Sequence, residues 1–245
     1  MTVEKFAAAL SGIVGLKERT VGEEDGALID QLFFNDPDGF MICQSTIPQQ
    51  DGFWYGEKRA EEGKVFIEAF FDPVCPDSRD SWPPLKKALN QYGSRVTLVV
   101  HTFPLPYHDN AFATSRALHI VNNLNTNATY HLLEAFFEQQ DQFYNKATFN
   151  LSRAAVVDQI VKFATKALGN SYRSAIESGF TDTKTDHATR VGFKFGCLKG
   201  VYGTPFFFVN GFPLPNAGSA LNYIGWRKVL DPLVTKQGKT WVHTL

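Results

Sequence analysis

The sequence of 245 residues has almost no net charge and lacks long hydrophobic runs. Its 24 Lys and Arg residues nearly balance 25 Asp and Glu residues, which gives a formal charge of -1 at pH 7. Because no global basic field exists, we expect neither nucleic acid nor an anionic membrane surface as a partner. No apolar run reaches the roughly 20 residues that cross a bilayer, so no membrane span is predicted.

Cysteines are also scarce, and their number is odd. The three are Cys43, Cys75 and Cys197. They are too few for a disulfide scaffold and too scattered to form a zinc site by themselves. The histidines do not show metal-ligand spacing either, and no metal site is predicted. At least one thiol must stay unpaired within the chain.

The remaining composition is that of an ordinary globular protein. Hydrophobic residues make up 44% and charged residues 20%, and 22 Phe, 8 Tyr and 4 Trp residues supply a substantial core. The apolar stretch 5–16 is a poor secretory signal, since charged residues follow and no clear cleavage site appears, and we expect a short amphipathic helix. Asn127-Ala128-Thr129 and Asn150-Leu151-Ser152 are glycosylation acceptors only in the secretory pathway, so the compartment stays open.

A shift in charge divides the chain near residue 44. Residues 1–43 hold three basic and eight acidic residues, whereas the remainder holds 21 basic and 17 acidic ones. Within this first part, 28–34 and 40–43 are apolar runs, and the segment between them contains Pro37 and Gly39. This pattern predicts a β-hairpin, which needs a sheet to join.

The segment 32–42 resembles the closing strands of the glyoxalase I-like vicinal oxygen chelate family. In that family the segment leads to a metal-ligating Glu, but here Cys43-Gln44 follows Ile42. The resemblance covers about 25 residues, and the rest of that fold is missing. We therefore expect a fragment without a metal site or lyase activity.

The main domain is expected after a polar linker at 44–62 that carries one aromatic patch. Residues 65–71 have strand composition, a helix follows through Trp82, Leu85 and Leu89, and 96–103 form a second strand. These elements predict a βαβ unit with parallel strands. Helical periodicity then extends over about 110–199, and a strand at 206–210, a turn at Gly211 and a helix around 226–234 complete a mixed α/β sheet with a helical insert.

Two short motifs flank the helical insert. Cys75-Pro76-Asp77-Ser78 stands where a strand ends and a helix begins, so the thiol lies near unsatisfied backbone N–H groups that favour the nucleophilic thiolate. Gly203-Thr204-Pro205 directly precedes a strand, where a proline is tolerated. The two motifs in this order form a fairly specific combination.

With these motifs, residues 70–78 and 200–211 resemble the DsbA-like branch of the thioredoxin superfamily, and most closely a plant group that is normally secreted. The resemblance spans 63–236. It implies an α/β thioredoxin-like fold with an inserted helical domain, here extended by the N-terminal hairpin. It also implies protein or peptide disulfides as substrates and a secretory or extracellular location. Cys75 matches the attacking cysteine and Pro205 the cis-proline, while Thr204, Pro76 and Asp77 fall in the substrate-binding part.

The sequence departs from this family at two site positions. Ser78 replaces the second, resolving cysteine, so a mixed disulfide at Cys75 has no partner there to release it. The place of the buried acid that assists proton transfer in many relatives is Ala69, and Glu68 is one residue off, on the opposite face of a strand. Cys197 and Cys43 are alternative resolvers, and His108 is a candidate to line the cleft above Cys75.

The leading hypothesis is thiol-disulfide exchange, as an oxidoreductase or isomerase, on protein or low-molecular-weight disulfides. Cys75 would attack and Ser78 would stand beside it. One alternative is a glutathione transferase or isomerase of the kappa type, in which Ser78 or Cys75 bonds the glutathione sulfur. Another is a redox-inactive member that binds peptides. No cofactor is expected other than glutathione as a co-substrate.

Overall fold

The computed structural model describes residues 16–24, 27–35, 41–46, 52–56, 64–215 and 218–236, and the chain divides into two compact units, Met1–Asp51 and Gly52–Leu245. The first unit contains an antiparallel sheet in the order β1-β2-β3, formed by β1 (Leu16–Glu24), β2 (Ala27–Asn35) and β3 (Met41–Thr46). The predicted hairpin is present as β2 and β3. The expected helix at 5–16 lies outside the described residues except for Leu16, which begins β1.

β1 is a strand that the sequence did not predict, because only two strands were expected in residues 1–43. Its sequence, Leu16-Lys17-Glu18-Arg19-Thr20-Val21-Gly22-Glu23-Glu24, is largely charged, so hydrophobic alternation does not mark it as a strand. It nevertheless pairs with β2 almost along its whole length, from Leu16 opposite Phe34 to Glu24 opposite Ala27. The first unit is therefore a three-stranded sheet.

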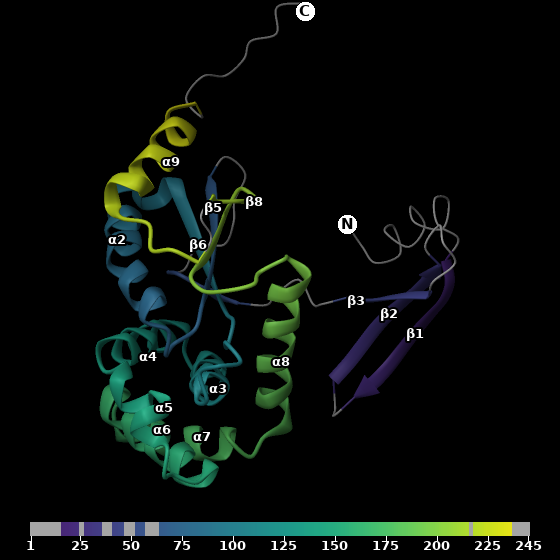
Figure 1. The fold of residues 1–245 in the computed structure, drawn as a ribbon, viewed down its shortest axis with the longest axis vertical. Helices are drawn as coiled ribbons and strands as arrows, with labels where there is room; N and C mark the ends of the chain where they lie inside the picture. The colour runs from purple at the N-terminus through teal and green to yellow at the C-terminus, as the bar shows by residue number, and fades with distance from the viewer. Residues whose placement is uncertain are drawn as a thin grey trace, which may run out of the picture. The chain divides into compact units, whose positions relative to one another are not determined.

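The second unit is built on a mixed five-stranded sheet in the order β4-β6-β5-β7-β8 (Figure 1). The strands are β4 (Phe53–Trp54), β5 (Val65–Phe71), β6 (Val96–Thr102), β7 (Phe206–Val209) and β8 (Phe212–Pro213). β5 and β6 are parallel and the other pairs are antiparallel. Asn210 and Gly211, both with positive φ, close the two-residue turn between β7 and β8. The predicted mixed α/β sheet is confirmed.

The predicted linker at 44–62 is wrong at its start and in its middle. Residues 44–46 belong to β3, and Phe53 and Trp54 form the edge strand β4 beside Val99 and Val100 of β6. Phe53 is buried, and the Tyr130 hydroxyl donates a hydrogen bond to its carbonyl oxygen. The aromatic patch is therefore a packing element of the main sheet, and two residues are too short for a strand period to show in the sequence.

α2 (Pro76–Tyr92) connects β5 to β6, as the βαβ prediction requires, and begins with proline at its first turn. It buries Trp82, Leu85 and Leu89 against the sheet. α9 (Tyr223–Lys236) lies beside α2 (Figure 1), and the Tyr92 hydroxyl donates to an Asp231 oxygen at 2.6 Å. These two helices cover one face of the sheet.

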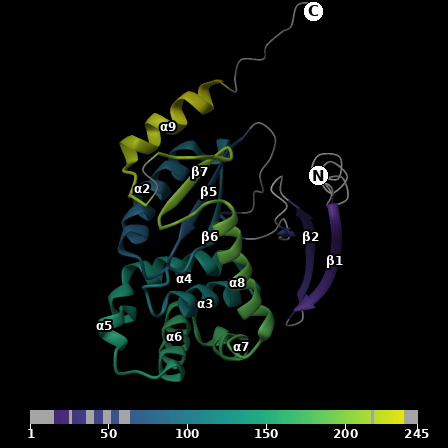
Figure 2. The same ribbon diagram turned by 45° about the vertical axis from the view of Figure 1, so that its right-hand side comes forward.

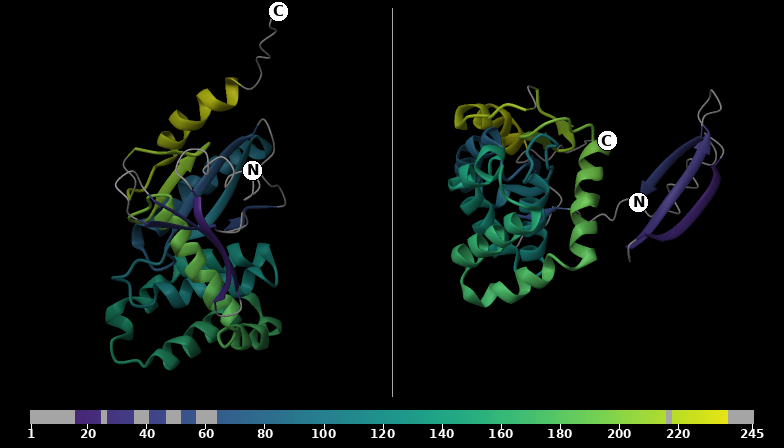
Figure 3. Two further views of the ribbon diagram at one scale, coloured as in Figure 1. Left: turned by 90° about the vertical axis from the view of Figure 1, so that its right-hand side faces the viewer. Right: turned by 60° about the horizontal axis from the view of Figure 1, so that its bottom comes forward.

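Between β6 and β7 the chain is helical, which matches the predicted insert. It comprises α3 (Ala111–Asn122), α4 (Thr126–Glu138), η2 (Gln140–Phe143), α5 (Asn145–Thr148), α6 (Arg153–Leu168), η3 (Asn170–Tyr172), α7 (Arg173–Gly179) and α8 (Thr183–Leu198). Asn125, Ser152 and Asp182 cap α4, α6 and α8 through their side chains. α8 runs back from this helical layer towards the sheet (Figures 2 and 3). No helix in the described residues is both long and apolar enough to cross a membrane.

The sheet separates two hydrophobic clusters because side chains alternate along β5. Ile67, Ala69 and Phe71 point into the larger cluster, which contains the buried side chains of α2, α4 and α6. Phe70 points into a smaller cluster on the other side. That cluster consists of Phe70, Cys75, Phe103, Leu105, Val201, Phe206 and Phe208, with Phe193 and Phe195 of α8 packed against it. The cysteine of interest is thus part of the smaller cluster.

Candidate active site

Cys75 is held at the start of α2 by the turn that follows β5. The Asp72 carboxylate accepts a hydrogen bond from Val74 N at 2.9 Å, and the Asp72 carbonyl oxygen accepts one from Cys75 N at 3.0 Å. Cys75 has extended backbone angles and is the N-cap residue, with Pro76 at the first helical position. Its thiol therefore lies at the helix end where backbone N–H groups have no helical acceptor.

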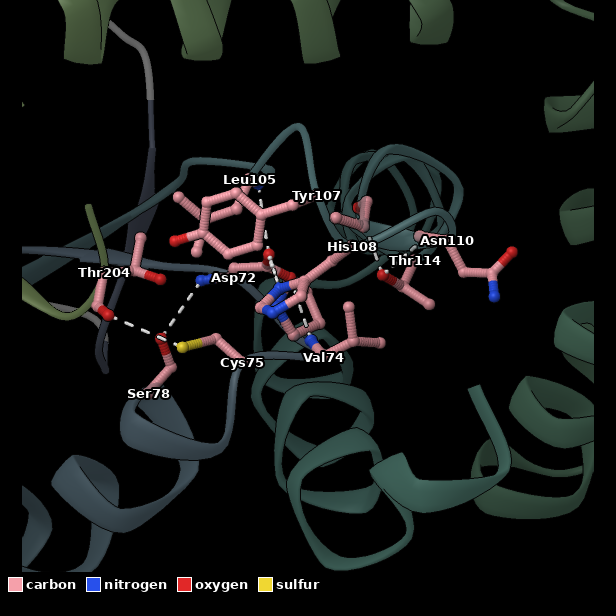
Figure 4. A network of polar contacts seen from close by, with 12 residues as sticks. Asp72, Val74, Cys75, Ser78, Leu105, Tyr107, His108, Asn110, Thr114 and Thr204 are labelled. Atoms are coloured by element: carbon pink, nitrogen blue, oxygen red, sulfur yellow. Dashed lines mark hydrogen bonds and ion pairs between the residues drawn. The ribbon is translucent and has the colours of Figure 1, made fainter. Parts of the chain in front are cut away.

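The second motif, Gly203-Thr204-Pro205, also lies next to the Cys75 thiol. The Thr204-Pro205 peptide bond is cis, and Cys75 Sγ donates to the Thr204 carbonyl oxygen at 3.4 Å (Figure 4). Both Cys75 and Thr204 are almost fully buried. The fold thus joins the two motifs that the sequence singled out, although 129 positions separate them. A carbonyl oxygen is an acceptor, so this bond needs the proton of the thiol.

The other predicted residues of the first motif divide between surface and interior. Pro76 and Asp77 are exposed at the first turn of α2. Ser78 is fully buried, and its Oγ accepts a hydrogen bond from Asp72 N at 3.3 Å (Figure 4). The Ser78 hydroxyl is therefore engaged with the active-site turn, whereas Pro76 and Asp77 are available to a bound molecule.

Glu68 forms its own polar contacts on the face of β5 opposite Ala69, as its place in the strand predicts. Its carboxylate oxygens lie 2.6 Å from Lys199 Nζ, and His101 Nε2 lies 3.6 Å from one of them. Burial raises the pKa of Glu68, but hydrogen bonds from His101 and Lys199 outweigh burial and leave this pKa below its ordinary value. Ala69, at the family's acid position, faces the larger core cluster.

A buried carboxylate that sequence reasoning missed stands nearer to Cys75. Asp72 is completely buried, and its Oδ2 lies 2.8 Å from His108 Nδ1 and accepts a hydrogen bond from Leu105 N at 3.1 Å (Figure 4). From the sequence only His108 is a candidate for this part of the site, and Asp72 is not singled out. A polar residue between a strand and a cysteine is a weak signal, and its partner lies 36 positions away.

His108 lines a hollow that begins next to Cys75. The hollow has a volume of about 280 Å³. It is bounded by Val74, Pro76, His108, Phe143, Tyr144, Asn145 and Lys146. Asn110 is the N-cap residue of α3 but makes no side-chain cap bond, and its amide donates to Phe143 O and Thr148 Oγ1.

The helical insert also supports the active-site turn directly. Gln140 is buried, and its Nε2 donates to the carbonyl oxygens of Pro73 at 3.2 Å and Cys75 at 3.3 Å. The Tyr144 hydroxyl donates to Gln140 Oε1 at 2.8 Å. These bonds fix the two carbonyl groups on either side of the turn, so the insert positions the cysteine as well as covering the sheet.

Exposed tyrosines lie near both motifs. Tyr107, next to His108, and Tyr202, two residues before Thr204, are 63% and 75% exposed. The Tyr202 ring packs on Phe206 with centroids 5.4 Å apart. Exposed aromatic side chains beside a reactive group are suited to contact an unfolded peptide.

The other cysteines lie apart from this site or outside its description. Cys75 and Cys197 are both free thiols, and Cys197 is exposed in the last turn of α8. Partial burial raises the pKa of Cys197. Cys43 falls in β3, where side chains lie outside the description. In the side chains that the structure describes, no three metal-ligating residues come together.

Comparisons with known proteins agree with this geometry. A family model described as Thioredoxin matches residues 49–231. The fold is similar to that of a proposed protein-disulfide isomerase from Pseudomonas syringae, with 19% identity, a TM-score of 0.61, and coverage of 77% of this chain and 98% of that chain. The thiol-disulfide exchange protein alpha-DsbA2 from Wolbachia pipientis is 15% identical, with a TM-score of 0.57 and coverage of 74% of this chain and 87% of that chain. MdbA, a thiol-disulfide oxidoreductase from Actinomyces oris, is 21% identical, with a TM-score of 0.54 and coverage of 79% of this chain and 91% of that chain. The search of curated proteins found no significant match.

Proposed function

Since this chain belongs to the thioredoxin family, with its α/β fold and a helical insert, we propose that it exchanges thiols and disulfides through a single attacking cysteine, Cys75. The observation that carries the proposal is the meeting of the Cys75 thiol with the carbonyl oxygen of Thr204 at a cis Thr-Pro bond, at the start of α2. The three structural neighbours that are described as thiol-disulfide proteins support the same chemistry.

In the proposed reaction the Cys75 thiolate attacks one sulfur of a substrate disulfide. A bond forms between Cys75 Sγ and that sulfur, the substrate S–S bond breaks, and its second sulfur leaves as a thiolate. The helix end stabilises the negative charge on Sγ before the attack. Because Ser78 cannot release the mixed disulfide, a second thiol from the substrate or from a small molecule such as glutathione must complete the exchange.

We propose extended protein or peptide segments as the substrates. The Thr204 backbone, which meets the Cys75 thiol through its carbonyl oxygen, is the proposed pairing partner of an extended chain, and Tyr107 and Tyr202 offer exposed rings nearby. Pro76 and Asp77 form the exposed start of α2 on the other side of the thiol. A chain laid across the site would contact all of these groups.

We place this activity in an oxidising compartment, as expected for the secreted plant DsbA-like group. Protein disulfides form and persist in such an environment, and the acceptor residues Asn127 and Asn150 are both exposed. For residues 1–43 we propose no activity, because the similarity to the vicinal oxygen chelate family lacks its metal-ligating Glu.

Two alternatives receive less support from the geometry. A glutathione transferase of the kappa type needs a hydroxyl or thiol that faces the glutathione sulfur, and the Ser78 hydroxyl is buried and bonded to Asp72 N. A redox-inactive peptide binder has no need for a cysteine at the helix end. The first alternative predicts that glutathione raises the melting temperature of the protein in the absence of any disulfide.

Refolding of a scrambled, disulfide-containing protein in a glutathione buffer tests the proposal. We expect the chain to accelerate recovery of the native substrate and the Cys75→Ala variant to lose at least about 90% of that acceleration, since the attacking sulfur is gone. Cys197→Ala is the matched control and should retain it. Equal acceleration by Cys75→Ala and the unmodified chain would show that Cys75 is not the attacking group and would favour the peptide-binding alternative.

A further inference from the structure

The proposed exchange leaves one step without an assigned residue. A small thiol that releases the mixed disulfide at Cys75 must first lose its proton, because a cysteine thiol has a pKa of about 8.5 and is mostly protonated at pH 7. The residue at the family's acid position is Ala69, and Ser78 is no substitute for a second thiol. A base for the incoming thiol must come from elsewhere.

Asp72 and His108 have the arrangement of an orienting carboxylate and a base. Asp72 accepts hydrogen bonds from Val74 N and Leu105 N, and both donors are backbone groups that suit the ionised, acceptor-only carboxylate. Its Oδ2 lies 2.8 Å from His108 Nδ1. The carboxylate therefore holds the imidazole proton on Nδ1 and leaves Nε2 with a free lone pair.

The surroundings of His108 give a small molecule access to it. The His108 side chain is 22% exposed, whereas Asp72 is completely buried. His108 and Pro76 both line the hollow of about 280 Å³, so the hollow reaches from the imidazole to the residue after Cys75. The titratable or charged groups on the elements around the imidazole are Asp72, Cys75, Asp77, Tyr107, Tyr144 and Lys146. Lys146 at the rim is a cation that favours thiols carrying a carboxylate.

We propose that His108 is the catalytic base that activates a low-molecular-weight thiol to release the mixed disulfide from Cys75, with Asp72 as its positioning residue. This inference rests on the proposed exchange function. His108 Nε2 takes the proton of the incoming thiol, and the resulting thiolate attacks the substrate-side sulfur of the mixed disulfide. The bond between that sulfur and Cys75 Sγ breaks, and Cys75 leaves as a thiolate at the helix end. The substrate departs as a disulfide with the small thiol, and the imidazolium returns its proton to solvent.

Release of a defined adduct tests this step. The full-length chain is loaded at Cys75 with a cysteine-containing peptide, reduced glutathione is added, and mass spectrometry of the digested protein follows the Cys75 adduct with time. His108→Asn keeps an N–H donor towards Asp72 but has no base, and His131→Asn, on an exposed position of α4, is the matched control. We expect His108→Asn to slow release at least about 10-fold at pH 7, the lower part of the range for general base catalysis.

The pH dependence and chemical rescue separate catalysis from structure. At about pH 9 glutathione ionises without help, so the difference between His108→Asn and the unmodified chain should narrow to less than about 3-fold. Added imidazole should restore release in His108→Ala at pH 7. Equal release by His108→Asn and the unmodified chain at pH 7, or no response of His108→Ala to imidazole, would overturn the inference. Failure of Cys75 to form the adduct at all would instead overturn the proposed function.

Discussion

At the residue scale, the chemistry of Cys75 is set by two opposing groups. The start of α2 offers backbone N–H groups without a helical acceptor, while the Thr204 carbonyl oxygen, 3.4 Å from Sγ, accepts a bond from the thiol. A substrate chain that pairs with the Thr204 backbone would compete for this region. Attack and substrate binding are thus coupled at one backbone group.

Ser78 offers the most direct change at this scale. In Ser78→Cys a thiol would occupy a buried place one helical turn after Cys75. With glutathione disulfide as the oxidant, Cys75 first forms a mixed disulfide with glutathione, and the introduced thiol then displaces reduced glutathione from Cys75. The resulting protein disulfide oxidises a reduced two-cysteine peptide, whose second thiol displaces Cys75. We expect peptide oxidation to be at least about 10-fold faster than with the unmodified chain and the same oxidant, because displacement of glutathione from Cys75 becomes intramolecular. Electrophoresis of the peptide after thiol blocking measures it.

The matched control for this gain is Ser81→Cys. Ser81 is also fully buried in α2, and its hydroxyl donates to the Asp77 carbonyl oxygen at 2.7 Å, but it lies six residues after Cys75. We expect this variant to oxidise the peptide no faster than the unmodified chain. If Ser78→Cys were no better than Ser81→Cys, the site would lack more than its second cysteine.

These site residues differ in how far the sequence reveals them. Cys75 and Pro205 are marked by short local motifs at element boundaries, and the fold only has to join them. Asp72 and His108 carry no such mark, because their contact depends on where the loop after β6 returns to the end of β5. No residue spacing in the sequence predicts where this loop comes back to the end of β5. Glu68 is the opposite case, since strand alternation alone predicts that it lies on the opposite face of β5 from Ala69.

At the element scale, the Glu68–Lys199 ion pair ties β5 to the end of α8. Lys199 directly follows α8 and begins the segment that leads to Thr204 and Pro205. Its ammonium group also lies 4.4 Å from the centre of the Phe208 ring on β7. The ion pair therefore supports the loop that leads to Thr204 and Pro205, next to Cys75.

We expect Glu68→Gln to lower the free energy of unfolding by about 1–3 kcal/mol at pH 7, the range for hydrogen bonds to charged groups in a mostly buried setting. The pKa of Glu68 is lowered in the folded protein from its ordinary value of 4.5. The pair's contribution is therefore fully present above about pH 4.5 and is lost as the pH falls through the lower folded pKa. Urea unfolding at about pH 7 and pH 3 measures this change.

Glu177→Gln serves as the comparison for that experiment. Glu177 pairs with Arg173 at 2.8 Å on an exposed face of α7, where a single ion pair contributes little. Glu177→Gln should change the free energy of unfolding by no more than about 0.5 kcal/mol at both pH values. A difference between Glu68→Gln and the unmodified chain that remained constant down to about pH 3 would contradict the assignment of the low pKa to Glu68.

Elements with a clear period could be predicted from the sequence, and short or charged ones could not. β5, α2 and β6 follow apolar patterns with proline at the breaks, and their parallel pairing follows from the intervening helix. β4 has only two residues, and its pairing with β6 depends on packing against Tyr130 and His119 of the helical insert. β1 is held by hydrogen bonds to β2 despite its charged side chains.

At the scale of the whole molecule, all residues of the candidate site belong to the unit Gly52–Leu245. The helical insert is part of the site as well as a cover for the sheet, because Gln140, Tyr144 and His108 reach the turn before Cys75 or the hollow beside it. The unit Met1–Asp51 contributes a separate sheet and one further thiol, Cys43. The intact chain therefore carries three cysteines, of which Cys75 and Cys197 are free thiols in the described residues.

Competition among these three thiols tests the central claim most directly. The intact, reduced chain is mixed with less than one equivalent of an oxidised peptide disulfide, quenched with a thiol-blocking reagent, and mapped by mass spectrometry after digestion. We predict that the mixed disulfide forms first at Cys75, at least about 10-fold faster than at the exposed Cys197, since only Cys75 lies at a helix start. Equal labelling of Cys75 and Cys197, or labelling of Cys197 alone, would contradict the account.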